Sequence, residues 1–248
     1  MYIFGDIGNS DTKIYLVNSN YKILKRGIFS TQKVNSKYLD SNFKKLIKNF
    51  HKVEKILFCS VVPKCFNSIK KFLKKKTKQK CYEIKDLNLN SLIKIKVNYK
   101  QVGSDRITNA ISLNNSKDNY IILDFGTATT FDVVTGKDYQ GGIIAPGIKI
   151  SLNSLHDKAF LIPKINLKKI NKVIGVDTKT AVRSGFFWGY AGLIDNIINL
   201  IKKEKKKSFK IVLTGGFSEL FKKSMKSKAT HNKDITVQGL IKISKLIK

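Results

Sequence analysis

Apolar positions along the chain fall into short runs that alternate with stretches of helical periodicity. The short apolar or alternating runs predict strands at residues 2–7, 12–18, 21–30, 55–61, 120–124, 130–134 and 210–214. Apolar residues at helical spacing predict helices at residues 39–50, 63–76, 105–113, 147–156, 178–203 and 236–247. Because both kinds of element are mixed along the whole chain, the pattern predicts an α/β fold that opens with an antiparallel meander.

The pattern at the end of the first predicted strand recurs about half a chain later. Residues 6–10 read DIGNS and residues 124–128 read DFGTA, so each strand ends in Asp-x-Gly, small polar residues and a returning strand. Such an internal repeat indicates two similarly built domains that face one another. We place them at residues 1–116 and 117–248, with the join in the polar stretch 114–119.

Each Asp-x-Gly turn has the composition of a phosphate-binding loop. Glycine lets the backbone approach a phosphate closely, and backbone N–H groups with Asn, Ser or Thr side chains donate hydrogen bonds to it. The strand-end carboxylate suits Mg²⁺ or another cation, and Lys13 adds a positive charge after the first turn. An ordinary β-turn explains either motif alone, but two in matching surroundings favour a clamped polyphosphate. The sequence has neither GxxxxGK[ST] nor a GxGxxG that opens a helix.

Residues 103–106 read GSDR and place an acid beside an arginine at a predicted helix start. Asp105 is a candidate helix cap or a candidate general base that accepts the proton of an alcohol. Arg106 is suited to bind a carboxylate or phosphate with its forked guanidinium. Gly215 and Gly216 follow a predicted strand, where they either let an adenine lie against the backbone or form a strand-to-helix turn.

The net charge of +31 leaves two interpretations open, nucleic-acid binding or compositional drift. Arginine, the preferred reader of phosphate and guanine, occurs only at Arg26, Arg106 and Arg183, so we favour drift and expect no specific nucleic-acid partner. The sequence has no apolar run of membrane-spanning length and no signal-peptide pattern. Its three cysteines have no metal-type spacing, so we expect a cytoplasmic protein in a reducing compartment.

Taken in order, these motifs resemble those of the type III pantothenate kinases of bacteria, within the actin/Hsp70/sugar-kinase superfamily. The matching segments are DIGNS at 6–10, GSDR at 103–106, DFGTATTFDVV at 124–134, GGIIAPGI at 141–148, IGVDT at 174–178, SGFFWGY at 184–190 and TGG at 214–216. The resemblance implies two ribonuclease-H-like domains facing a central nucleotide cleft, and a homodimer. It also implies phosphorylation of pantothenate by ATP to 4′-phosphopantothenate, the first step of coenzyme A biosynthesis.

The resemblance further implies roles for single residues. It implies that Asp105 accepts the proton of the substrate hydroxyl. The implied substrate-binding residues are Tyr99, Gly103, Ser104, Asp105, Arg106 and Thr178. The ATP-binding residues become Asp6, Ile7, Gly8, Asn9, Ser10, Asp11, Thr12, Lys13 and Thr127, to which we add Gly215 and Gly216. Asp124 corresponds to the site of a monovalent cation, K⁺ or NH4⁺, and Asp6 is a candidate partner of Mg²⁺.

The chain departs from the family pattern in a few places. The stretch before Gly103 looks shortened, so Tyr99 is assigned the role of the family's tyrosine. Ser104 stands where alanine is common, and Asp177 stands where asparagine is more usual, which adds a negative charge near a substrate carboxylate. Two other functions stay open: a non-catalytic transcription accessory factor of the same family, and a kinase for a different small alcohol.

Overall fold

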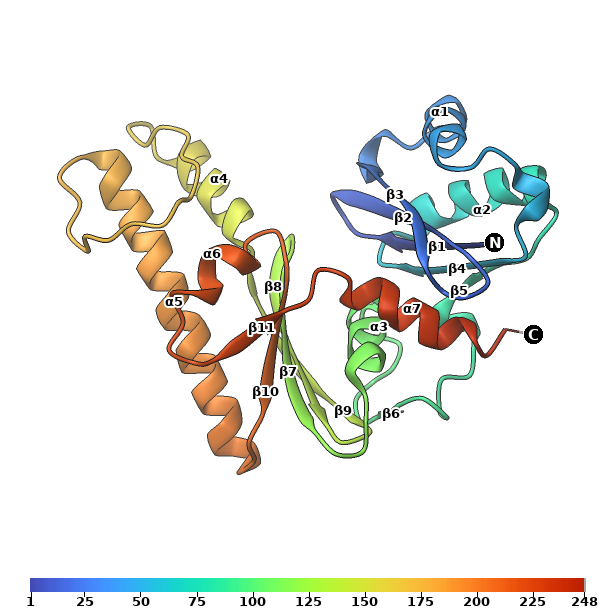
Figure 1. Cartoon of the computed structure of the whole chain (residues 1–248). Helices are drawn as coiled ribbons and strands as arrows, with labels where there is room; N and C mark the ends of the chain where they lie inside the picture. The colour runs from blue at the N-terminus through green and yellow to red at the C-terminus, as the bar shows by residue number, and fades with distance from the viewer. Residues whose placement is uncertain (248) are drawn as a thin grey trace. The chain divides into compact units, whose positions relative to one another are not determined.

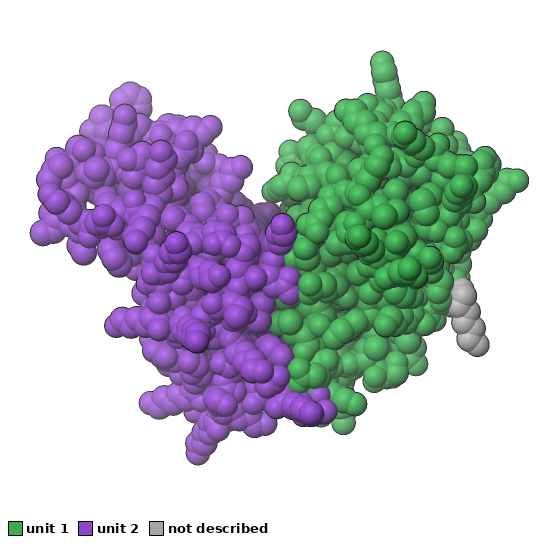
Figure 2. All heavy atoms as spheres, viewed as in Figure 1, with its two compact units in different colours: residues 1–115, 137–139, 234–248 green, residues 116–136, 140–233 purple. Residues whose placement is uncertain are grey.

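The computed structural model describes residues 1–247, which form two compact units (Figures 1 and 2). Unit 1 consists of residues 1–115 and 137–139 together with the chain from Asp234 onwards. Unit 2 consists of residues 116–136 and 140–233. This division differs from a single cut after residue 116, because the last helix belongs to unit 1.

Unit 1 is built on a five-stranded sheet in the order β3-β2-β1-β4-β5. Its strands are β1 (Tyr2–Ile7), β2 (Asp11–Val17), β3 (Ile23–Ser30), β4 (Lys55–Ser60) and β5 (Cys81–Glu83). The first three form the predicted antiparallel meander, while β4 runs parallel to β1 and β5 parallel to β4. Because successive side chains of a strand point to opposite faces, β1 contributes to two layers of core.

Two pairs of helices accompany this sheet. Helices α1 (Ser36–Leu46) and α2 (Pro63–Thr77) share one apolar core with Ile3 and Ile7 of β1. Helices α3 (Ser104–Leu113) and α7 (Ile235–Ser244) pack on each other and against β4, and α7 also packs against β1. Short 3₁₀ turns occur at Thr31–Lys33, Phe50–Lys52 and Ile84–Asp86.

The packing of α7 explains why the end of the described chain returns to unit 1. A Cβ atom on Gly239 would lie only 2.0 Å from the carbonyl oxygen of Thr108, so the two helices touch backbone to backbone. The Thr236 hydroxyl donates to Asn109 Oδ1 at 2.8 Å. These buried contacts join α7 to α3, which places this helix in the first unit and not the second.

Unit 2 contains most of a six-stranded sheet in the order β11-β10-β7-β8-β9-β6. Its strands are β7 (Asn119–Phe125), β8 (Ala128–Thr135), β9 (Asp138–Pro146, whose first two residues belong to unit 1), β10 (Lys210–Gly215) and β11 (Ala229–His231). Within unit 1, β6 (Lys94–Ile95) pairs with Asp138 and Tyr139 at the start of β9. The helices are α4 (Ile148–Lys158), α5 (Thr178–Lys205) and α6 (Ser218–Lys222). The long helix α5 buries Phe187, Ile194 and Ile198 in the core of this unit.

The two sheets share one topology. Counting strands in chain order within each unit, both follow third-second-first-fourth-fifth, as β3-β2-β1-β4-β5 and as β9-β8-β7-β10-β11. In both, the first and second strands pair antiparallel, and the fourth pairs parallel to the first. The prediction of an α/β fold with two similar domains is therefore confirmed.

Several predicted boundaries shift. The helix expected at 39–50 occupies Ser36–Leu46, because the side chain of Asn35 caps its start by accepting from Tyr38 N at 2.9 Å, and the chain is extended again at Ile47. The glycine-rich stretch 141–147 continues strand β9 as far as Pro146. Strands β5, β6, β9 and β11 and helix α6 were not predicted. Among residues 1–247, no helix combines the length and the apolar character that crossing a membrane demands.

Candidate active site

The first Asp-x-Gly turn connects β1 to β2. Asp6 lies opposite Lys13 in the register of the two strands, and Lys13 Nζ lies 3.4 Å from Asp6 Oδ2. The backbone N–H of Gly8 donates to the carbonyl of Asp11 at 3.0 Å and closes the turn. Asn9 is exposed at its tip. The turn therefore presents backbone N–H groups beside a carboxylate and an ammonium group, the set that a phosphate and its cation need.

Thr31 holds this turn in place with two hydrogen bonds. Its hydroxyl donates to the Gly8 carbonyl at 2.8 Å, and its backbone N–H donates to the Ser10 carbonyl at 3.0 Å. The Thr12 hydroxyl lies 2.9 Å from that of Thr31 and is buried. Of the predicted residues 6–13, Ile7 and Thr12 thus point their side chains into the core, and only their backbone faces the turn.

The GSDR motif forms the start of α3. Gly103 is the N-cap residue, and a Cβ atom there would lie 2.4 Å from Asp105 Oδ1 and 3.5 Å from Val61 Cγ1. Asp105 Oδ1 accepts a hydrogen bond from the Arg106 backbone N–H at 2.8 Å. Glycine therefore lets the Asp105 carboxylate fold back against the first turn of its own helix. Ser104 is buried at the same helix end.

Cys59 shows that the first turn and the GSDR motif lie together within unit 1. Its Sγ atom lies 3.7 Å from Asp6 Oδ1, since Cys59 on β4 is the register partner of Asp6 on β1. Burial raises the pKa of the Cys59 thiol well above its usual value, and the negative charges of Asp6, Asp105 and Glu83 raise it further. The charges of three carboxylates thus act on one buried thiol. Neither Cys59 nor Glu83 could be recognised in the sequence, because their importance depends on which strands are neighbours.

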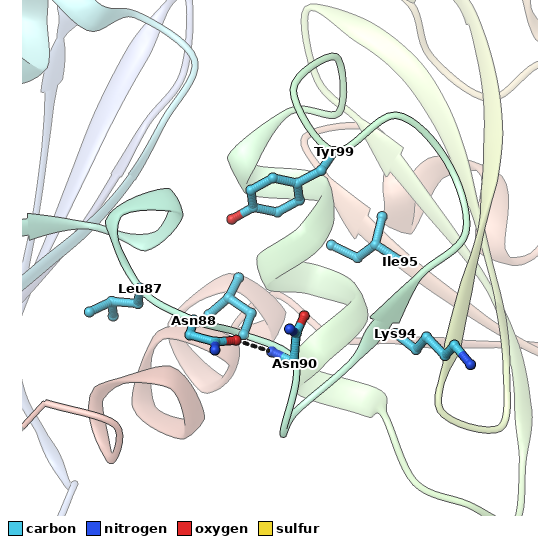
Figure 3. A pocket seen from close by; sticks show the side chains of 7 residues that line it. Leu87, Asn88, Asn90, Lys94, Ile95 and Tyr99 are labelled. Carbon is cyan, nitrogen blue, oxygen red and sulfur yellow. Dashed lines mark hydrogen bonds between the residues drawn. The ribbon is translucent and has the colours of Figure 1, made fainter.

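Tyr99 lies in the loop before α3 and lines a separate pocket. Lys85 Nζ lies 5.4 Å from the centroid of its ring, and within the described chain its phenolic oxygen is buried without a hydrogen-bond partner. Burial, followed by the charges of Glu83 and Asp86, raises the pKa of Tyr99. The pocket has a volume of about 640 Å³ (Figure 3), and its lining residues are Leu87, Asn88, Leu89, Asn90, Lys94, Ile95 and Tyr99. None of these lining residues belongs to the GSDR motif.

The second turn, in unit 2, lies at the equivalent strand ends of its sheet but is one residue shorter, since Asp124 pairs with Thr130 where Asp6 pairs with Lys13. Asp124 on β7 pairs with Thr214 on β10, as Asp6 pairs with Cys59. The Gly216 N–H donates to the Phe125 carbonyl at 3.1 Å, at the position where Val61 N–H donates to Ile7 in unit 1. Asp124, Gly215 and Gly216 are therefore brought together at one end of this sheet.

Gly147 packs on the second turn and was absent from the predicted site. A Cβ atom on it would lie 1.9 Å from the carbonyl oxygen of Thr127, so the end of the GGIIAPGI segment touches the turn directly. Thr127 itself is exposed. The repeated glycines of that segment suit a place where another part of the backbone comes close, but the sequence does not show which part.

Thr178 is the first residue of α5, in unit 2, and is exposed. The preceding Asp177 caps this helix, because its Oδ1 accepts from the Thr180 backbone N–H at 2.8 Å. This hydrogen bond is the main cause that lowers the pKa of Asp177. Asparagine and aspartate cap helices about equally well. Aspartate in place of the family's asparagine therefore still caps α5 and adds a negative charge beside Thr178.

The carboxylates of Asp6 and Asp124 suit cations whose remaining ligands are substrate phosphates or waters. Residues 1–247 contain no group of three or more His, Cys, Asp or Glu side chains arranged to hold a metal ion. Mg²⁺ in phosphate-transfer sites is commonly held by one or two carboxylates with substrate phosphates and waters, which fits the single carboxylate of Asp6. In unit 2, Asp124 Oδ1 and the Phe125 carbonyl oxygen each lie 2.6 Å from where a Cβ of Gly215 would be. The Phe125 backbone nitrogen lies equally close, so Gly215 leaves room for the strand end of β7 and the Asp124 carboxylate to pass beside it.

The comparison with known proteins identifies the family. A family model described as type III pantothenate kinase matches residues 2–200. A type III pantothenate kinase of Pelagibacter ubique is 64% identical over 248 residues, which cover 100% of both chains. This chain belongs to the type III pantothenate kinase family. The resemblance seen in the motifs is therefore confirmed, and the segments at 6–10, 103–106 and 214–216 lie on the turns and the helix start described above.

Solved structures show that the fold extends beyond the type III pantothenate kinase family. A Campylobacter jejuni protein, described as a candidate transcriptional activator of the Baf family, is 20% identical with a TM-score of 0.61 and coverage of 98% and 97% of the two chains. A Sinorhizobium meliloti protein, described as a candidate 2-dehydro-3-deoxygalactonokinase, is 9% identical with a TM-score of 0.62 and coverage of 100% and 99%. At such identities the likeness establishes the shared fold alone.

Proposed function

We propose that this chain transfers the γ-phosphate of ATP to the hydroxyl of pantothenate, giving 4′-phosphopantothenate and ADP in the first step of coenzyme A biosynthesis. The observation that carries the proposal is the 64% identity to a type III pantothenate kinase over the full length of both chains. The acid-bearing turns at equivalent positions of the two sheets support it, because phosphoryl transfer depends mainly on alignment and charge neutralisation.

Asp105 acts in this proposal as the general base. The pantothenate hydroxyl oxygen attacks the γ-phosphorus, the bond from that phosphorus to the bridging oxygen of ADP breaks, and the hydroxyl proton passes to the Asp105 carboxylate. Gly103, Ser104, Arg106 and Tyr99 contact the substrate with it. The place of Asp105 in the first turn of α3, where Gly103 leaves room for its carboxylate, supports this assignment.

The first turn binds the phosphates of ATP. Backbone N–H groups and side chains of residues 6–13 hydrogen-bond the phosphate oxygens, and Lys13 neutralises part of their charge. Asp6 would hold the Mg²⁺ ion that accompanies ATP, and this ion would supply positive charge beside the phosphates. The 3.4 Å pairing of Lys13 with Asp6 supports a shared electrostatic role for these two side chains.

The second turn, in unit 2, binds a monovalent cation in this proposal. Asp124 holds K⁺ or NH4⁺, Thr127 contacts ATP, and Gly215 and Gly216 lie against the adenosine. The test is the turnover rate in potassium compared with the rate in a bulky organic cation. Equal rates on the unmodified protein would contradict the cation site, whereas we expect turnover that needs potassium and is lost in Asp124→Ala.

We further propose a homodimer whose partner surfaces lie in unit 2, with Thr178 contributing to the substrate site. Ten large apolar side chains of this unit are exposed: Ile143, Ile144, Ile150, Phe160, Leu161, Val173, Ile174, Val176, Trp188 and Leu200. Exposed apolar surface of this extent commonly marks a protein interface.

We also propose that the protein works in the cytoplasm. The cysteines at 59, 65 and 81 are free and buried, which supports a place in a reducing compartment.

The deciding experiment measures ADP release by the purified protein with ATP, Mg²⁺ and potassium, with and without pantothenate. Release that depends on pantothenate is the expected result. Release that depends instead on another compound from a panel of small alcohols would replace the substrate. If no alcohol stimulates ADP release, the enzymatic proposal fails. The next measurement is then DNA binding at a series of salt concentrations. A preference for particular DNA sequences would indicate a regulator, whereas binding without preference would indicate attraction by charge alone.

A further inference from the structure

Thr31 is a buried residue beside the turn that connects β1 to β2. It follows the last residue of β3 and begins the 3₁₀ turn Thr31–Lys33. It is only 6% exposed, so its hydroxyl must find hydrogen-bond partners within the protein. Both of its donors are used on the turn, because the hydroxyl donates to the Gly8 carbonyl and the backbone N–H donates to the Ser10 carbonyl. Two carbonyls of the turn therefore point toward Thr31.

The direction of these two carbonyls sets the direction of two N–H groups. In a planar trans peptide the C=O and the N–H point in opposite directions. The peptide with the Gly8 carbonyl carries the Asn9 N–H, and the peptide with the Ser10 carbonyl carries the Asp11 N–H. Both N–H groups therefore point away from Thr31, and both residues are exposed. Successive backbone N–H groups presented in this way form the kind of site that binds phosphate oxygens.

A second buried hydroxyl fixes the orientation of the Thr31 hydroxyl. Thr12 Oγ1 lies 2.9 Å from Thr31 Oγ1, and Thr12 is completely buried. A carbonyl can only accept, so the single hydroxyl proton of Thr31 is used on Gly8, and Thr12 must donate to Thr31. The Cys65 thiol on α2, with Sγ 3.8 Å from Thr12 Oγ1, is then the donor to Thr12. A directed chain of hydrogen bonds thus runs from α2 to the turn.

We propose that Thr31 is a positioning residue for ATP, which holds the Asn9 and Asp11 N–H groups in the direction in which they bind phosphate oxygens. The inference rests on the proposed binding of ATP at this turn. Thr31 acts through the turn, since its hydroxyl and its N–H are both used there. Without the hydroxyl, the peptide after Gly8 gains freedom to rotate, so ATP must order the turn when it binds and its affinity falls.

The test compares Thr31→Val and Thr31→Ala, which lack the hydroxyl, with Thr31→Ser, which keeps it. Titration calorimetry with ATP and Mg²⁺ should give a Kd on the order of fivefold higher in Thr31→Val and Thr31→Ala, the usual net contribution of one hydrogen bond. Thr31→Ser should bind within about twofold of the unmodified protein. In steady-state kinetics the KM for ATP should rise by the same factor in the two variants without the hydroxyl, while the KM for pantothenate stays unchanged.

Thr77→Val is the matched control. Thr77 is also 6% exposed, and its hydroxyl also donates to a carbonyl, that of Leu73, at 2.8 Å within α2. Thr77→Val should lower the melting temperature about as much as Thr31→Val and leave the Kd for ATP at the unmodified value. The positioning role is wrong if the Kd of Thr31→Val is unchanged, or if Thr31→Ser or Thr77→Val raises it equally.

Amide hydrogen exchange separates this inference from the proposed ATP site. Gly8 N–H donates to the Asp11 carbonyl at 3.0 Å and closes the turn. Its exchange should be faster in Thr31→Val and unchanged in Thr31→Ser and Thr77→Val. Unchanged exchange in Thr31→Val would overturn the inference even if the unmodified protein binds ATP. If exchange responds as expected but the unmodified protein does not bind ATP, the proposed function is rejected and Thr31 has a structural role alone.

Discussion

Asp105 illustrates how much of this site depends on the immediate surroundings of one side chain. Its carboxylate accepts from the next backbone N–H in its own helix, over a glycine that leaves no Cβ in its way. Its charge is also felt by the Cys59 thiol, on a strand far away in the sequence. These contacts fix the carboxylate at the start of α3.

Asp105→Asn should therefore leave the fold and ATP binding intact while turnover falls by roughly 10²- to 10⁴-fold, the usual contribution of a positioned base. Single-turnover kinetics and a nucleotide-binding titration separate the two effects. Asp40→Asn is a suitable control, because that carboxylate pairs with Lys44 and Lys76 on the surface of the same unit. Near-normal turnover in Asp105→Asn would refute the assignment of the base.

The buried thiols provide a second test at this scale. Burial raises the pKa of Cys81 to about 12, and all three cysteines are buried. Thiolates and not thiols react with aromatic disulfide reagents, so the folded protein should react very slowly at pH 8 and rapidly in guanidinium. Because unfolded thiols ionise near pH 9.0 while folded Cys81 stays protonated, the free energy of unfolding should fall as pH rises above that value. Rapid labelling of the native protein would contradict this burial.

At the scale of elements, the sequence predicted the long strands and helices because their apolar periodicity is strong. The antiparallel meander and the helices near α2, α3 and α5 were recognised from it. Strands of two or three residues, such as β6 and β11, have too few positions to display a period. The pairing of α7 with α3 also has no local signal, because Gly239 is informative only once Thr108 is known to lie against it.

Two helical glycines give opposite predictions for the same substitution. Gly239→Ala should destabilise the protein by about 1–3 kcal/mol, because its Cβ would lie 2.0 Å from the Thr108 carbonyl and the helices must separate. Gly189→Ala on α5 meets nothing within 4 Å and should stabilise it by about 0.5–1 kcal/mol through helix propensity. Chemical denaturation measures both. A Gly239→Ala protein as stable as the unmodified one would contradict the close packing of α7 on α3.

At the scale of the whole molecule, the site residues are distributed over two sheets of equal topology. The sequence revealed the repeat of Asp-x-Gly, and the family resemblance named residues on both turns. It did not reveal that Cys59 and Thr214 occupy equivalent positions beside Asp6 and Asp124, because strand order is set by contacts distant in sequence. The supporting residues Thr31 and Gly147 were missed for the same reason.

The proposed dimer is tested by changing only exposed side chains. Phe160 and Leu161 have exposed fractions of 101% and 83%, so Phe160→Asp with Leu161→Asp should not disturb the folded chain. We expect light scattering after size exclusion to give half the mass of the unmodified protein. Ile28→Asp, at a 67% exposed position of unit 1, is the control and should keep the dimer mass. The interface assignment fails if the double variant retains that mass as well.

The return of the chain to unit 1 has a consequence for biosynthesis. Helix α7 buries Ile235, Val237, Leu240 and Ile243 completely, yet the ribosome makes these residues after all of unit 2. Unit 2 is therefore able to fold during translation, while the nascent unit 1 exposes the surface that awaits α7. The half of the protein that is translated first completes its folding last, and during that interval it depends most on chaperones.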